Sequence, residues 1–443
     1  MFRLPLRPPL REPLRDAFLR AGNISQAIRA LFANNQQGAW YDPSDFSTLF
    51  QDSAGATAVT AVEQPVGLMR DKSGRNNHAS QITAASRPVV SARVNLLTKS
   101  EQFDDAAWGK NAVLTVSANS VTAPDGTLTA DTLTRNAAAT VSYADLTQSI
   151  TASGGNVGKT YTSSVWLWTN SGTLAASLVI SDLNFNTYTQ AITVTTTPTR
   201  FTFTSSGGAG WNVSGTQIAF GLNVAINSVF NAWGAQLDVG TATRYQRVNT
   251  ASDYDTAGFP MYLRFDGVDD GMATAAINFS ATDKMTVWAG AFRGGTTALG
   301  ILAELAAGGA LGSMYVAAPY SGTQRYAFVL TGTTTSAQSY DTLASPAALA
   351  EVTSCAFDIA GAAVNDEIKP RINGATGAVT NFVAGPAGTG NFGNHPLFIG
   401  RRNNASLPFT GNLYSLIIRG AASNAAEIAV TERYVANKTG VTL

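Results

Sequence analysis

The chain has 443 residues, of which only 13% are charged, and its 29 basic residues balance its 29 acidic residues. This length predicts two or three domains, and a neutral chain offers no electrostatic attraction to nucleic acid or to an anionic membrane. With 45% hydrophobic residues the chain is too apolar for disorder, and its 41 glycines among many Thr, Ser, Ala and Asn residues are typical of β-sandwiches.

A single cysteine, Cys355, excludes internal disulfides and any zinc site built from cysteines. No run of about 18 apolar residues exists, so the sequence predicts no membrane span. Prolines and arginines interrupt the first residues, which therefore do not resemble a signal peptide. We expect a protein that is made in a cytoplasm and leaves it, if at all, by lysis or assembly.

The first 15 residues repeat Pro-Leu-Arg three times, starting at Pro5, Pro9 and Pro13. The prolines exclude a helix, so the segment is expected to be extended and to have no core of its own. Leucine side chains and guanidinium groups on such an extended segment are suited to docking onto another protein. The alternative is a disordered terminal segment. On the docking interpretation the anchoring residues are Leu6, Arg7, Leu10, Arg11, Leu14 and Arg15.

Helix and strand signals follow along the chain. An apolar stripe at 24–32 predicts a short helix. Residues 39–95 contain too few strands for a sandwich, whereas the Thr/Ser/Val alternation of 95–245 predicts eight or nine strands, the number in one jelly roll. Strand signals resume in 258–443, and the chain closes with a helix that Asn424 is expected to cap.

Residues 95–238 resemble a known family. The resemblance rests on N-L-L-T-K-S-E-Q-F at 95–103, P-D-G-T at 124–127, Y-T-S-S-V-W at 161–166 and W-G-A-Q-L-D at 233–238. These motifs, in this order, are similar to the carbohydrate-binding-module-like jelly roll of bacteriophage fibre and spike proteins. The resemblance implies the family, and it does not identify a ligand.

A second resemblance joins two separated segments. It rests on W-Y-D-P-S-D at 40–45, D-K-S-G at 71–74, N-H-A at 77–79 and F-D-G-V-D-D at 265–270. These runs resemble phage concanavalin-A-like (laminin-G-like) modules, in which the first part leads almost directly into the last run. Here the jelly roll intervenes, which implies that it is inserted.

The expected fold is therefore all-β, with two jelly-roll β-sandwich domains, one inserted in the other. Residues 38–94 and 251–443 would form one concanavalin-A-like sandwich, and residues 95–250 would form the inserted jelly roll. A short extended or helical N-terminal anchor, 1–37, and a C-terminal helix complete the expected organisation. Domain termini usually lie close together at the surface, so one domain can be inserted into another with little distortion of the host domain.

Aromatic rings that face solvent are candidates for stacking on sugars. In the predicted strand at 161–169, Trp166 and Trp168 project to one face and Val165 and Leu167 to the other, so one pair is not needed for the core. The candidate glycan-binding residues are Trp108, Tyr143, Trp166, Trp168 and Trp211. The alternative for each of them is a place in the core of the sandwich.

Calcium is the only cofactor that the sequence suggests. Jelly-roll glycan modules often hold a structural Ca²⁺ through carboxylate and backbone oxygens. Glu101, Asp131 and Asp238 stand at motif positions that could converge on such an ion. Asp266, Asp269 and Asp270 could hold a second ion in the other domain. The alternative, which we favour, is that these side chains stabilise a turn.

Nothing in the sequence favours catalysis. The S-G-G-N-V-G-K-T run at 153–160 nearly matches a phosphate-binding loop, but a strand follows where a helix is required. The only histidines, His78 and His395, lie in Asn/Gly-rich turns and are not near a nucleophile motif. With 29 acidic residues, adjacent carboxylates do not indicate a glycosidase. We therefore expect no enzyme activity.

The resemblances imply a virion structural protein, made in the cytoplasm of the bacterial host and located in the particle. We expect a tail-tip or tail-fibre adhesin that contacts other virion proteins through its N-terminus and binds host-surface glycan or a neighbouring protein. It is expected to be a homo-oligomer or to be present in several copies on the particle. The alternatives are a head fibre or capsid decoration protein, and a surface-polysaccharide hydrolase. Neither nucleic acid nor membrane insertion is expected.

Overall fold

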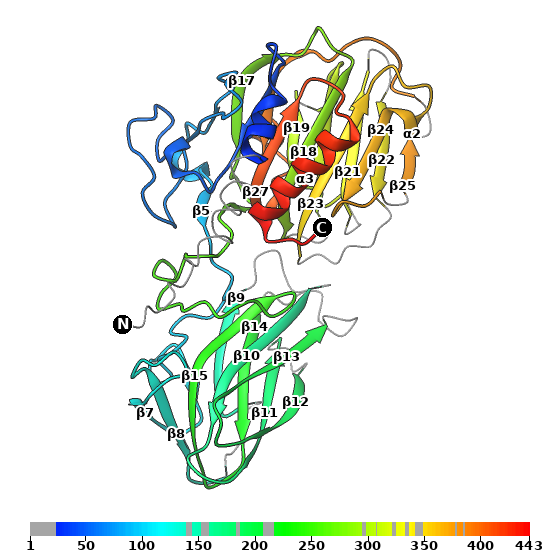
Figure 1. Ribbon diagram of the computed structural model, residues 1–443. Helices are drawn as coiled ribbons and strands as arrows, with labels where there is room; N and C mark the ends of the chain where they lie inside the picture. The colour runs from blue at the N-terminus through cyan, green and yellow to red at the C-terminus, as the bar shows by residue number, and fades with distance from the viewer. Residues whose placement is uncertain are drawn as a thin grey trace, which may run out of the picture.

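The computed structural model confirms an all-β fold, in which two β-sandwiches carry most strands and the helices are few (Figure 1). It describes residues 24–138, 144–151, 159–182, 187–206, 217–294, 298–306, 308–320, 325–332, 336–341, 349–376, 379–383 and 386–443. Within these ranges, no helix is long and apolar enough to cross a membrane.

The first sandwich, called the discontinuous sandwich, takes strands from both sides of the inserted segment. Its seven-stranded sheet has the order β24-β23-β18-β27-β16-β5, and β1 also pairs with β27. These strands are β1 (Gly38–Tyr41), β5 (Val89–Ser91), β16 (Tyr262–Asp266), β18 (Lys284–Arg293), β23 (Ala350–Asp358), β24 (Ile368–Ile372) and β27 (Thr410–Arg419). The antiparallel register places Trp40 opposite Ile417 and Leu263 opposite Leu413.

The second sheet of the discontinuous sandwich has ten strands, in the order β2-β3-β4-β17-β26-β19-β20-β21-β22-β25. They are β2 (Leu49–Phe50), β3 (Leu68–Met69), β4 (Ala79–Ser80), β17 (Met272–Asn278), β19 (Ile301–Leu305), β20 (Ser313–Ala317), β21 (Ala327–Thr331), β22 (Ser336–Asp341), β25 (Val379–Val383) and β26 (Asn394–Ile399). The apolar faces of the two sheets meet in one core that includes Tyr41, Phe265, Val287, Phe328 and Leu416.

The inserted sandwich is formed by two five-stranded antiparallel sheets. One has the order β13-β10-β15-β8-β7 and the other β12-β11-β14-β9-β6. The strands are β6 (Gly109–Lys110), β7 (Leu114–Val121), β8 (Ala130–Arg135), β9 (Leu146–Thr151), β10 (Thr160–Trp168), β11 (Leu174–Ser181), β12 (Thr187–Val194), β13 (Thr199–Ser206), β14 (Gln217–Val224) and β15 (Ser228–Val239). Its separate core includes Leu133, Val165, Leu178, Phe220 and Leu237.

The two crossings of the chain between the sandwiches are hydrogen-bonded to each other. The side-chain oxygen of Gln246 accepts hydrogen bonds from the backbone amides of Val94 and Asn95, at 2.7 and 3.1 Å. The side-chain nitrogen of Gln246 donates to the Ala92 carbonyl at 2.9 Å, and that of Asn95 donates to the Ala235 carbonyl at 3.0 Å. The inserted sandwich is therefore entered and left at one place (Figure 1).

Two helices cover the outer face of the seven-stranded sheet. Residues 24–30 are helical, and α3 (Ala425–Thr439) packs with them over Trp40, Trp288 and Ile417. As predicted, Asn424 caps α3 in a capping box with Glu427. The smaller helical elements are η1 (Phe46–Thr48), η2 (Ala84–Ser86) and α2 (Val364–Glu367).

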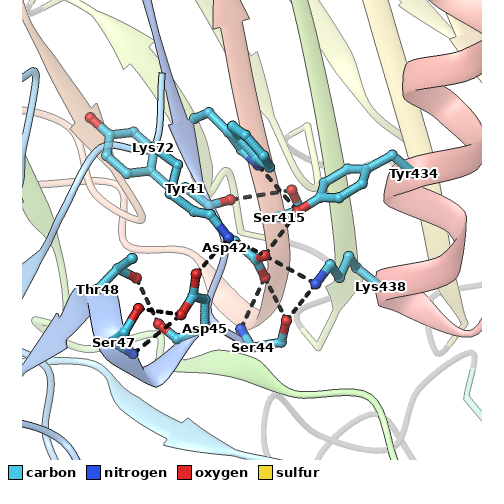
Figure 2. Close-up of polar contacts among 11 residues, drawn as sticks. Tyr41, Asp42, Ser44, Asp45, Ser47, Thr48, Lys72, Ser415, Tyr434 and Lys438 are labelled. Atoms are coloured by element: carbon cyan, nitrogen blue, oxygen red, sulfur yellow. Dashed lines mark hydrogen bonds and ion pairs between the residues drawn. The ribbon is translucent and has the colours of Figure 1, made fainter. Parts of the chain in front are cut away.

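A buried polar network joins β1 to α3 (Figure 2). The carboxylate of Asp42, which is 1% exposed, accepts a hydrogen bond from the Tyr434 hydroxyl at 2.9 Å and pairs with Lys72 at 2.9 Å and Lys438 at 3.0 Å. Trp40 Nε1 donates to the Tyr434 hydroxyl at 3.2 Å. Burial alone would raise the pKa of Asp42, but the two lysines and the hydrogen bonds lower it to about 2.

Candidate functional site

Aromatic side chains gather on the outer face of the β13-β10-β15-β8-β7 sheet. Along β10, Val165 and Leu167 enter the core of the inserted sandwich, so Trp166 and Trp168 project from the opposite face, as the alternation predicts. Trp233 from β15 and Tyr245 from the segment that follows it pack against them. We call Trp166, Trp168, Trp233 and Tyr245 the aromatic cluster.

The rings of the aromatic cluster meet mainly edge to face. The centroids of Trp166 and Trp233 are 5.1 Å apart at an interplanar angle of 67°, and those of Trp166 and Tyr245 are 5.5 Å apart at 77°. Trp168 and Trp233 are buried, at 7% and 4% exposure, whereas Trp166 and Tyr245 are only partly buried. These two rings therefore present the accessible aromatic surface of the cluster.

A β-bulge brings Trp233 to this face. Between Ser164 and Trp166 the pairing of β10 with β15 shifts register, because β15 carries one extra residue there. Gly234 lies in the bulge with a φ of +64°, a conformation that favours glycine, and a Cβ on it would lie 3.0 Å from the Trp166 ring. Glycine at this position thus permits both the bulge and the close approach of Trp166.

Charged groups border the aromatic rings. The guanidinium carbon of Arg200 lies 4.8 Å from the centroid of a Trp166 ring, and its Nη atoms donate to the Thr243 carbonyl and the Ser164 hydroxyl, both at 2.8 Å. The Tyr245 hydroxyl donates to Glu101 at 3.0 Å. Burial raises the pKa of Glu101 to about 7. Apolar ring surface beside a guanidinium and a carboxyl group can contact both the C–H faces and the hydroxyls of a sugar.

The predicted glycan-binding residues have different outcomes. The structure corrects Trp108, which is 2% exposed and packs in the core, with ring centroids 5.0 Å from Phe103 and 5.6 Å from Phe220. Trp168 belongs to the outer face but is buried within the aromatic cluster. Tyr143 and Trp211 lie outside the described residues.

Three members of the site were not among the predicted ones. Arg200, Trp233 and Tyr245 surround Trp166 in space. The W-G-A-Q-L-D run contains Trp233, but strand alternation does not reveal a bulge. Tyr245 lies outside a named strand, so no periodicity assigns it to a face.

The predicted calcium ligands do not come together. The carboxylate oxygens of Glu101, Asp131 and Asp238 do not all lie within 4.8 Å of one another, because each serves a different part of the inserted sandwich. Asp131 accepts from the amides of Phe103 and Asn119, both at 2.8 Å. Asp238 accepts from the side chains of Gln236 and Thr243, and Glu101 accepts from Tyr245. These three residues therefore do not form the expected ion site.

Among the described residues, one acidic group does converge. Carboxylate oxygens of Asp266, Asp269 and Asp270 lie within 4.8 Å of one another at the turn between β16 and β17. Asp266 accepts from the Val268 amide at 2.8 Å, Asp270 from the Asp266 amide at 3.0 Å, and Asp269 from the Ser86 hydroxyl at 2.8 Å. These hydrogen bonds agree with the interpretation that the acidic side chains stabilise the turn.

The six anchoring residues predicted at the N-terminus lie outside the described residues. They are Leu6, Arg7, Leu10, Arg11, Leu14 and Arg15. The described chain begins with the helix at residues 24–30, and Ile28 in this helix and Phe32 just after it are buried against the discontinuous sandwich.

No protein-family model and no curated protein matches this sequence. Among solved structures, the Ruminococcus gnavus IT-sialidase CBM40 is 16% identical over 34% of this chain and 84% of its own, with a TM-score of 0.27. The CBM22-1 xylan-binding domain from Paenibacillus barcinonensis Xyn10C is 14% identical over 34% of this chain and 100% of its own, with a TM-score of 0.25. Domain 4 of AbnA, a GH43 extracellular arabinanase from Geobacillus stearothermophilus, in complex with arabinotriose, is 15% identical over 39% of this chain and 76% of its own, with a TM-score of 0.27. Because these TM-scores are below 0.5, we conclude nothing about this chain from them.

Proposed function

We propose that the inserted sandwich binds carbohydrate on the outer face of its β13-β10-β15-β8-β7 sheet, with Trp166 as the central contact. The observation that carries this proposal is the aromatic cluster, whose large rings project from the side of the sheet opposite the core. The core is complete without these rings, because Val165, Leu167 and their neighbours fill it. Partly exposed aromatic side chains on a rigid sheet are a suitable surface for sugar rings.

Specificity would come from the polar groups beside Trp166. Arg200 offers N–H donors next to the ring, and Glu101 and Tyr245 offer a carboxyl and a hydroxyl group. Sugar hydroxyls both donate and accept hydrogen bonds, so a site with both kinds of partner can orient them. The site binds without chemistry, and weak single contacts gain strength when several copies bind together.

We propose further that the chain works as an adhesin on a bacteriophage particle, at a tail tip or tail fibre, attached through residues 1–37. The support for this step is the sequence resemblance to phage fibre and spike proteins. A head fibre or capsid decoration is the alternative position. Labelled antibodies against the chain, imaged on purified particles, test this step, and a signal at neither tail nor head would overturn it.

The substitution Trp166→Ala in the full chain tests the glycan site. We expect binding to the best ligand of a bacterial glycan array to weaken about tenfold or more, because stacking surface is lost. Trp166→Phe is the matched control, since it keeps an aromatic ring and should keep most of the binding. The melting temperature of both variants must be measured, because Trp166 also packs against Trp233 and Tyr245.

Two results would overturn this proposal. The first is a wild-type chain that binds no glycan of the array, and the second is a folded Trp166→Ala variant that binds as well as the wild type. Release of reducing ends from capsule or lipopolysaccharide fragments by the purified chain would instead favour the hydrolase alternative.

A further inference from the structure

A cleft of about 710 Å³ lies between the two sandwiches. Its lining residues come from the end of β9, the start of β10 and the end of β15 on the inserted sandwich, and from β16, the start of β27 and the end of α3 on the discontinuous sandwich. Its volume falls within the range of about 300–1,000 Å³ that is usual for small-ligand sites, which often lie between domains. The cleft is separate from the aromatic cluster, because none of the four rings of the cluster lines it.

The charge of the cleft is positive. Among its described lining residues, the cations are Arg93, Lys159, Arg244 and Arg264, and the only acidic residue is Asp238. Asp238 already accepts hydrogen bonds from the side chains of Gln236 and Thr243, and it interacts electrostatically with Arg200. Of these three partners, only Thr243 lines the cleft. Arg264 forms an ion pair with Glu63, with Nη2 of the arginine 2.9 Å from Oε2 of the glutamate. The other cations of the cleft are Arg93, Lys159 and Arg244.

Within the described residues, Arg93 and Arg244 donate hydrogen bonds only to neutral groups. Arg93 donates to the carbonyls of residues 95, 96 and 97, at 2.7–3.1 Å. Arg244 lies over the Phe259 ring, with its guanidinium carbon 4.3 Å from the centroid, and donates to the Ala257 carbonyl. Neither arginine forms an ion pair with a described carboxylate.

Lys159 adds a buried charge to the same cleft. Its side chain is 3% exposed, and burial lowers its pKa to about 8. A bound anion would offset this desolvation, because an opposite charge nearby favours the ammonium form. The cleft therefore holds a cation whose charged state an anionic ligand would stabilise.

The other walls of the cleft are aromatic. Tyr262 and Tyr414 meet edge to face with centroids 5.3 Å apart, and the Tyr262 hydroxyl donates to the Arg93 carbonyl at 2.6 Å, which holds the ring in place. Phe259 contributes a further ring under Arg244. A ligand that suits both features carries a negative charge and also has an apolar face.

We propose that the cleft between the sandwiches binds an acidic saccharide, with its carboxylate held by Arg244 and Lys159 and its ring against the tyrosines. Sugars of this class are uronic and sialic acids, which combine a carboxylate with C–H faces. The proposal does not depend on the Trp166 site, because the two sites share no aromatic residue. A ligand here would contact both sandwiches.

Calorimetric titration of the full chain tests the proposal, with an oligogalacturonide and sialyllactose as probes. The fully methyl-esterified oligogalacturonide is the matched neutral probe, because it keeps the sugar rings and loses the charge. We expect at least one acidic probe to bind and the ester to bind about tenfold more weakly or not at all. Arg244→Gln and Lys159→Gln should each weaken binding of the acidic probe about tenfold.

Two control variants locate the binding. Arg433→Gln removes a cation from the exposed face of α3 and should leave binding unchanged. Trp166→Ala should leave the ratio of acid to ester affinity unchanged, because the charge preference belongs to the cleft, so failure of the cleft and failure of the glycan site give different results. Arg244 is exposed, so its variant should fold even if the Lys159 variant does not.

Several outcomes would overturn the proposal. The proposal is wrong if neither acidic probe binds, or if the acid and its methyl ester bind equally well. It is also wrong if a folded Arg244→Gln variant binds the acidic probe as well as the wild type does. Competition by inorganic phosphate at millimolar concentration, with no added affinity from the sugar, would also overturn it, because the site would then recognise only a small anion.

Discussion

The carboxyl group of Glu101 lies beside Tyr245 and is partly buried, which raises its pKa to about 7. Burial likewise raises the pKa values of Asp131 and Asp238 to about 6. An acid whose pKa is higher in the folded than in the unfolded state binds its proton more tightly when folded. These three acids therefore make the free energy of unfolding decrease as the pH rises from about 4 to about 7.

The substitution Glu101→Gln tests this pH dependence. The amide keeps an oxygen that accepts the Tyr245 hydrogen bond, but it has no charge to desolvate. We expect the melting temperature near pH 7.5 to rise by roughly 2–4 °C and the gain to vanish near pH 4, where Glu101 is protonated in either state. Calorimetric scans across this pH range measure both effects.

Asp105→Asn is the control in the same sandwich. The pKa of Asp105 is lowered, chiefly by the Ala107 amide and also by Lys99, so its ionised form stabilises the fold. This variant should lower the melting temperature at neutral pH. If both variants raised it, a general effect of removing negative charge would explain the result, and the argument from Glu101 would fail.

At the scale of single residues, strand alternation identified which side of β10 is exposed but could not identify the whole site. Trp166 and Trp168 share the outer face because Val165 and Leu167 are needed inside. Trp108 precedes β6 rather than belonging to a regular strand, and no periodicity shows that it turns into the core. The bulge at Gly234 changes which face Trp233 takes, and this depends on the pairing partner.

At the scale of elements, helix α3 shows which features are local. Its capping box at Asn424 and its end at Gly440, with φ of +74°, depend on neighbouring residues and can be predicted from them. Its attachment to β1 through Asp42 and Lys438 depends on residues at opposite ends of the chain. The W-Y-D-P run and the closing helix are recognisable separately, but only the fold shows that they interact.

Tyr434→Phe tests how much this attachment stabilises the discontinuous sandwich. The change removes the hydroxyl that donates to Asp42 and accepts from Trp40 Nε1, and it leaves both buried groups with fewer partners. We expect the free energy of unfolding, measured by urea denaturation, to fall by about 1–3 kcal/mol.

A double-mutant cycle with Asp42→Asn separates the hydrogen bond from general packing. If the hydroxyl acts through Asp42, Tyr434→Phe should cost less in the Asp42→Asn background than in the wild type. Equal costs in the two backgrounds would mean that Tyr434 stabilises α3 without Asp42.

At the scale of the whole molecule, the sequence predicted the all-β class and two sandwiches, because strand counts and ordered motifs indicate them. The pairing of β1 with β27 and of β5 with β16 links residues before the inserted sandwich to residues after it. The size of the ten-stranded sheet was not predictable, since several of its strands are two residues long and carry no periodic signal. The positive cleft was also beyond prediction, because it is formed where the two sandwiches meet.

The strand pairing leads to a prediction about fragments. Residues 94–250 contain every strand of the inserted sandwich, whereas 251–443 lacks β1 to β5 and the buried side chains of Trp40, Tyr41 and Val90. We expect the fragment 94–250 to unfold cooperatively by itself and the fragment 251–443 to show no cooperative transition. Thermal melts followed by circular dichroism, with amide proton dispersion as a second measure, test both.

A third polypeptide makes the test specific, with residues 24–94 joined to 251–443 through a short Gly/Ser linker. Because Gln246 holds the two crossings side by side, the chain ends that this linker must join lie near each other. The joined polypeptide should recover a cooperative melt, since it restores β1 to β5 to their sheets. A cooperative melt of 251–443 without the first segment would show that these strands are dispensable, and the view of one sandwich built from two distant segments would then be wrong.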